Sequence, residues 1–173
     1  AMLMVSAWHN VEGAALLSDK DGAGGTHAKA AHSVIRDKQW WYGDVTNADF
    51  PGDVKEVPML LNAGDKTRVI ALWMSNTDAS YTTDMLDMDL DMSVLDPTGS
   101  PVAVSASALN AFELASFTPT MSGVYRVVLT KQRFLGSSEP LTVAWSTQND
   151  MGTAEILVDP SSSAPAVGAT TSF

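Results

Sequence analysis

The chain has 173 residues, of which 45% are hydrophobic and 17% are charged, and its formal net charge is −10 at pH 7. This much apolar material excludes an acidic disordered chain, and the shortage of cations argues against a protein that binds nucleic-acid phosphates. No apolar run approaches the roughly 20 residues of a membrane-spanning helix. Because cysteine is absent, disulfides, thiol catalysis and cysteine-ligated zinc are excluded.

The first 42 residues have a helical pattern that the rest of the chain lacks. Residues 2–8 are apolar nearly all round, which predicts the last two turns of a buried helix. A loop rich in glycine and charged residues follows, and Thr26 is a suitable N-cap for a second helix that ends at about Lys38. The apolar residues of this helix keep a spacing of three to four: Ala30, Ala31, Val34 and Ile35.

From residue 43 to 158 the chain consists of strand-forming runs separated by turn signals. Residues 67–75 form a continuous apolar run, and in 85–95 apolar and polar side chains alternate. Asp96-Pro97-Thr98-Gly99 has the composition of a tight turn. Further strands are expected at 102–105, 111–117, 124–130 and 141–146, with an edge strand at 154–158.

Alternation also predicts which side chains face the core. In 124–130 they are Tyr125, Val127 and Leu129, and in 141–146 they are Leu141, Val143 and Trp145. The pattern therefore predicts a mainly β protein: a jelly-roll β-sandwich of the galactose-binding-like kind, preceded by a short two-helix segment. We expect the helices in 1–42, the sandwich in 43–158 and a flexible tail in 159–173.

Acidic residues form a ladder beside the predicted turn. On an extended strand Asp87, Asp89 and Asp91 project from one face about 7 Å apart. Calcium binds such oxygen ligands, and Asp96 lies close enough in sequence to be a fourth. Two interpretations remain open: a calcium site formed by these four residues, or a solvated outer face that discourages edge-to-edge aggregation.

Three consecutive aromatic residues, Trp40, Trp41 and Tyr42, stand where the helical pattern gives way to strands. They could stack on a sugar ring or another polymer. Filling the junction between two packed elements is the more ordinary use of such bulk, and the sequence favours it.

No catalytic motif is complete. Gly25-Thr26-His27 resembles the Gly-Thr-His beside the catalytic histidine of subtilisin-like proteases, but the position of the general base is occupied by Gly24. A helix-capping Thr26 followed by a surface His27 is the simpler interpretation. There is no Gly-x-Ser-x-Gly elbow, phosphate-binding glycine loop or HExxH motif. Metal binding by His9, His27 and His32 together is not favoured.

Two parts of the chain resemble parts of the subtilisin-like serine peptidases, the subtilases. Residues 2–7 and 21–31 are similar to the closing segment of a subtilase catalytic domain. The later strands are similar to the β-sandwich modules that follow such domains, the pre-peptidase C-terminal and proprotein-convertase P-like domains. The matching stretches are 68–75, 89–99, 112–113, 123–127 and 144–146.

The resemblance implies that this is the C-terminal, non-catalytic portion of a secreted serine endopeptidase. The catalytic Asp, His and Ser would lie upstream of Met2, so no catalytic residue is carried over and the chain alone should be inactive. Its partners would be the catalytic domain, which the sandwich would stabilise, and protein substrates, which it would help to position.

Two alternatives remain open. One is a stand-alone, calcium-dependent module that binds carbohydrate or protein, with Trp40, Trp41 or Tyr42 as its platform. The other is an interaction surface for self-association or for a missing half, formed by exposed apolar residues of the helical segment: Met2, Leu3, Val5, Leu16 and Leu17.

Overall fold

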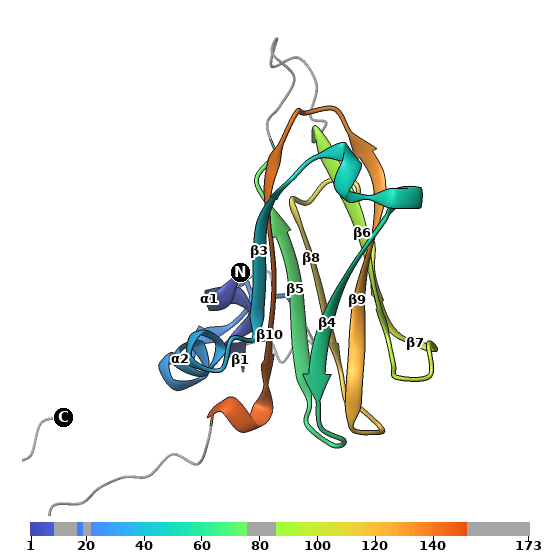
Figure 1. Cartoon of the computed structure of the whole chain (residues 1–173). Helices are drawn as coiled ribbons and strands as arrows, with labels where there is room; N and C mark the ends of the chain where they lie inside the picture. Colours follow the sequence, from blue (N-terminus) through green and yellow to red (C-terminus); the bar gives the residue numbers. More distant parts are fainter. Residues whose placement is uncertain (9–16, 19–21, 76–85, 152–173) are drawn as a thin grey trace, which may run out of the picture.

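The computed structural model describes residues 1–8, 17–18, 22–75 and 86–151. Two four-stranded antiparallel sheets face each other (Figure 1), with strand orders β3–β10–β5–β8 and β4–β9–β6–β7. The first sheet contains β3 (Trp40–Val45), β10 (Glu139–Thr147), β5 (Thr67–Trp73) and β8 (Phe112–Phe117). The second contains β4 (Val54–Leu61), β9 (Gly123–Phe134), β6 (Met88–Leu95) and β7 (Pro101–Ser105).

This strand order is that of a jelly roll. The chain crosses from one sheet to the other at every connection except the β6–β7 hairpin, and the first sandwich strand, β3, pairs with the last described strand, β10. The predicted mainly β, jelly-roll fold is therefore confirmed.

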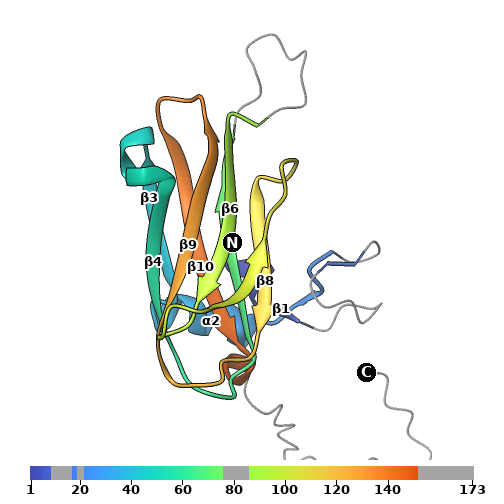
Figure 2. The same cartoon turned by 90° about the vertical axis from the view of Figure 1, so that its right-hand side faces the viewer.

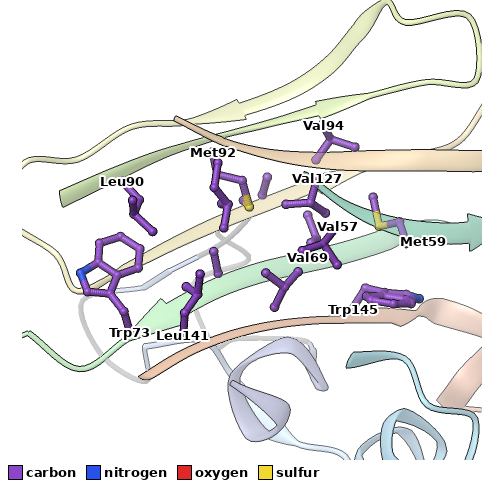
Figure 3. Close-up of a cluster of buried hydrophobic side chains, with 14 of the residues drawn as sticks. Val57, Met59, Val69, Trp73, Leu90, Met92, Val94, Val127, Leu141 and Trp145 are labelled. Carbon is purple, nitrogen blue, oxygen red and sulfur yellow. The ribbon is translucent and has the colours of Figure 1, made fainter. Parts of the chain in front are cut away.

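The core lies between the two sheets. Every predicted inward residue of β9 and β10 is buried: Tyr125, Val127, Leu129, Leu141, Val143 and Trp145. Figure 3 shows how the layers meet, with Leu90 and Met92 of β6 opposite Trp73 and Leu141 of the other sheet. Alternation along the strands supplies this core because successive side chains point to opposite faces of a sheet.

Two strands of the sandwich were not predicted individually. β3 includes all three aromatic residues assigned to the junction, so the expected boundary between residues 42 and 43 falls inside a strand of the sandwich. In β4, Val57, Met59 and Leu61 point into the core, but Pro58 interrupts the run. Proline is acceptable there because β4 is an edge strand.

The helical segment is shorter than expected. α1 (Met2–Val5) is a single turn, and β1 (Ala7–Trp8) then pairs with β2 (Gly25–Thr26). Thr26 is therefore not the cap of α2 (Ala28–Arg36). The cap is His27, whose Nδ1 accepts a hydrogen bond from the amide of Ala30 at 3.2 Å. Three 3₁₀ turns complete the described elements: η1 (Asn47–Asp49), η2 (Pro51–Asp53) and η3 (Gln148–Met151).

α1 and α2 pack on the outer face of the first sheet (Figure 1). The contact is a small second core that consists of Val5, Val34, Ile70, Leu114 and Ala144. Ile35, expected on the buried face of α2, is instead 52% exposed.

A buried arginine joins the N-terminal segment to the sandwich. Arg68 of β5 is 3% exposed, and its Nη1 donates hydrogen bonds to the carbonyl oxygens of Ala7 and Ala23, the latter at 3.0 Å. Burial lowers the pKa of this guanidinium. The predicted edge strand at 154–158, the tail at 159–173, His9 and Leu16 lie outside the described residues.

Candidate functional site

The aromatic cluster lies on β3 and divides between its two faces. Trp40 and Tyr42 are 43% and 55% exposed on the outer face, whereas Trp41 points inward and packs against the edge of the core. Lys55 of β4 places its Nζ 4.5 Å from the centroid of the Trp41 ring. The expectation that the cluster fills the junction is therefore wrong for Trp40 and Tyr42.

A glycine gives Trp41 its position. A Cβ atom at Gly43 would lie 3.0 Å from both Cη2 and Cζ2 of the Trp41 indole. The ring therefore lies flat along its own strand, and a larger residue at Gly43 would push it away from the strand.

The outer face of β3 carries a row of three side chains: Trp40, Tyr42 and Asp44. The Tyr42 hydroxyl donates a hydrogen bond to Oδ1 of Asp44 at 3.2 Å. This bond raises the pKa of Tyr42, because loss of its proton would place a second negative charge beside the carboxylate. The row combines two exposed rings with one exposed carboxylate, a surface suited to a ligand that is flat or cationic.

The acidic ladder on β6 is less uniform than its sequence indicates. Asp89 is only 6% exposed, and among the described residues its Oδ1 has no hydrogen-bond partner. Burial raises the pKa of Asp89. Asp91 is half-buried and accepts a hydrogen bond from Nε2 of Gln132 at 2.7 Å. The ladder is thus not a uniformly solvated face.

The fourth proposed ligand, Asp96, belongs to the predicted turn. Its Oδ1 accepts hydrogen bonds from the Thr98 hydroxyl at 2.6 Å and from the amides of Thr98 and Ser100 at 2.8 and 2.9 Å. These bonds, that from the Thr98 hydroxyl above all, lower the pKa of Asp96. In the described ranges no three His, Asp or Glu side chains converge on a metal position. Calcium binding by Asp87, Asp89, Asp91 and Asp96 stays a prediction.

The sequence analysis did not identify two buried carboxylates. Glu113 of β8 is 1% exposed, with Oε1 accepting from the amide of Ser107 at 2.7 Å and Oε2 from the Ser105 hydroxyl. Glu139 of β10 is 3% exposed. Burial raises the pKa of both, and Asp87 adds to the shift at Glu139. The available signal was an acidic residue inside the apolar run 111–117.

Comparisons with known proteins concern the fold. No protein-family model matches the sequence, and no curated protein matches it. One similar solved structure is the pre-peptidase C-terminal domain of a collagenase from Bacillus anthracis, at 11% identity and a TM-score of 0.43, covering 61% of this chain and 86% of that one. Another is a lipase of Bacillus licheniformis in its propeptide form, at 12% identity and a TM-score of 0.36.

The match to the lipase covers 65% of this chain but only 23% of the lipase. The fold assignment rests on the strand order of this chain itself. No helix in the described part of the chain is long and apolar enough to cross a membrane.

Proposed function

We propose that this chain is the non-catalytic C-terminal portion of a secreted subtilisin-like serine endopeptidase, in which the sandwich stabilises the catalytic domain and helps to position protein substrates. The observation that carries this proposal is the packing of the helical segment on the outer face of the first sheet. The segment that resembles the end of a catalytic domain is thereby attached to the segment that resembles its following β module.

The attachment is both apolar and polar. Ile70, Val34 and Leu114 are nearly inaccessible to solvent, and burial of such side chains contributes about 1.5–3 kcal/mol each. The two carbonyl groups that Arg68 binds belong to the N-terminal segment, so the guanidinium adds a directional link. Unfolding of the sandwich would therefore remove support from the helical segment and from whatever packs on it.

The test is to express the complete parent polypeptide and to assay casein cleavage with and without a serine-directed inhibitor. We expect inhibitor-sensitive cleavage. We also expect that Ile70→Ala, which opens a cavity under the helices, lowers the temperature of thermal inactivation, whereas Ile35→Ala at an exposed position does not. A complete and folded parent that leaves casein intact under all conditions contradicts the proposal.

A second candidate function is a stand-alone module that binds carbohydrate or fibrous protein, and the exposure of Trp40 and Tyr42 favours it. The test measures retention on insoluble polysaccharide and on collagen. The double variant Trp40→Ala, Tyr42→Ala should lose retention, and Leu60→Ala, at an exposed position on the other sheet, should keep it. A calcium-dependent module would also unfold at a lower temperature in chelator, because a ligand bound only to the folded state stabilises it.

A further inference from the structure

Within the described part of the chain, β3 is an edge strand that pairs with β10 alone. Figure 2 shows it with β4 at the left-hand side of the sandwich. The amide of Trp145 donates to the carbonyl of Gln39 at 3.0 Å, so Gln39 faces β10. Backbone groups along an antiparallel strand alternate in direction. The N–H and C=O groups of Trp40, Tyr42 and Asp44 therefore point away from the sheet.

β3 lacks three of the features that usually protect such an edge, and its one charged side chain is that of Asp44. Natural edge strands are blocked by proline, lysine or a bulge. The neighbouring edge β4 contains Pro58, and β7 begins at Pro101 beside a bulge in β6. All six residues of β3 are described; they include neither proline nor lysine, and their register with β10 is unbroken. Since no described strand pairs with this edge, its outward backbone groups can pair with an additional strand.

The side chains along β3 define what an added strand should carry. Its outer-facing residues would lie beside Trp40, Tyr42 and Asp44, where a cation can stack on a ring and pair with the carboxylate. Its inner-facing residues would lie beside Trp41, whose ring already has the ammonium of Lys55 over it. A second cation there would be repelled, so apolar residues fit better.

We propose that the free edge of β3 binds an extended peptide segment in which cationic and apolar residues alternate, by addition of the peptide as a fifth strand. The backbone groups of Tyr42 and Asp44 bind the peptide main chain, and the two side-chain rows select its sequence. The net charge of −10 attracts such a segment electrostatically. This inference rests on the proposed role in positioning protein substrates, for which it names the substrate feature that is recognised.

The binding test uses the full chain and an acetylated, amidated eight-residue peptide of alternating Lys and Val. We expect saturable binding, with slower hydrogen exchange at the amides of Tyr42 and Asp44 and unchanged exchange at Trp41, Gly43 and Val45. Three control peptides should bind weakly or not at all: four Lys followed by four Val, the same alternation with Glu in place of Lys, and the original peptide N-methylated at every second amide.

Two variants at one position separate the main-chain and side-chain contributions. Asp44→Asn removes only the charge and should weaken binding about two- to fivefold, the value of an exposed ion pair. Asp44→Pro also removes the outward amide and should abolish binding. The fold should tolerate this proline because β10 does not use the Asp44 amide. Glu56→Gln, the same change of charge on the other sheet, is the matched control and should bind as the unsubstituted chain does.

The proposal is overturned if the alternating and block peptides bind equally, or if binding does not saturate. It is also overturned if the amides of Tyr42 and Asp44 already exchange slowly in the free chain, because another part of the chain or a second copy then occupies the edge. If Asp44→Pro does not fold, Asp44→Asn and the N-methylated peptide still decide the outcome. Casein cleavage is not involved, so failure here leaves the endopeptidase proposal standing.

Discussion

Glu113 shows how burial and hydrogen bonding act in opposite directions on the pKa of one carboxyl group. The carboxylate accepts two hydrogen bonds, from Ser105 and Ser107, yet burial and the nearby Asp91 and Asp89 raise its pKa. The Ser105 oxygen can also accept a hydrogen bond, as it does from the amide of Leu114 at 3.3 Å. A neutral amide at position 113 could therefore keep both contacts.

We expect Glu113→Gln to raise the free energy of unfolding at pH 7. The gain should shrink as the pH falls and disappear near pH 4, where the wild-type carboxyl is itself neutral. Urea unfolding at both pH values measures it. Glu56→Gln, at an exposed position, should change stability little at either pH. A loss of stability at pH 7 on Glu113→Gln would show that the charge itself is needed.

Gly123 stands where a side chain has no room. Its φ is 153°, and a Cβ atom there would lie 2.8 Å from Cγ of Pro97 in the turn beside it. Gly123→Ala should cost about 1–3 kcal/mol of unfolding free energy through this overlap and backbone strain. Gly64→Ala is the control, because Gly64 also has a positive φ, of 85°, but an open space around it. Urea unfolding measures both variants. If they lose the same unfolding free energy, the overlap with Pro97 is not the cause of the loss.

At the scale of elements, the docking of α2 can be tested with neighbouring residues. Val34 is fully buried against the first sheet, and Ile35 is 52% exposed. Val34→Ala removes two buried methyl groups and should lower the free energy of unfolding by about 2 kcal/mol. Ile35→Ala should change the free energy of unfolding by no more than about 0.5 kcal/mol. Urea unfolding measures both. Similar losses at the two positions would mean that the helix docks by a different face.

The strands that the sequence predicted are those in which burial of apolar side chains dominates. In β5, β6, β9 and β10 the apolar residues fall in continuous or alternating runs, and burial follows them. β3 was not predicted because aromatic residues lie on both of its faces, so polar and apolar side chains do not alternate along it. Thr26 is the better intrinsic cap, but its pairing in β2 leaves His27 to cap α2.

The candidate site was predicted only in part. The sequence identified Trp40, Trp41 and Tyr42 as an aromatic cluster. It did not predict which of them are exposed, because their exposure depends on how much of the sheet α2 covers. The free edge of β3 depends on strand order, since any of the strands could have been its second neighbour. Asp89 looked solvated from its alternation, yet tertiary packing buries it.

For the whole molecule, the buried carboxyls predict a stability maximum at mildly acidic pH. The pKa values of Asp89, Glu113 and Glu139 are raised, so their protonated forms favour the folded state. Their contribution is complete below the ordinary carboxyl range of about 4–4.5 and is lost as the pH rises through their folded values. Neutralising part of the net charge of −10 acts in the same direction.

The opposite holds for Asp96 and Asp49, whose pKa values are lowered by hydrogen bonds, so their contribution is lost as the pH falls below about 4. Thermal unfolding between pH 3 and 8 should therefore give a midpoint that rises on acidification from neutral pH and falls again at the acid end. A midpoint that decreases steadily from pH 7 downward contradicts this balance.

The pairing of β3 with β10 also constrains when the protein can fold. The first sheet is complete only when residues 139–147 lie between β3 and β5, with almost the whole sandwich sequence separating the partners. A ribosome must therefore release nearly the entire domain before its central hydrogen bonds can form, and contacts so distant in sequence are slow to find. Until then the nascent chain exposes strand edges and apolar faces, which favour aggregation.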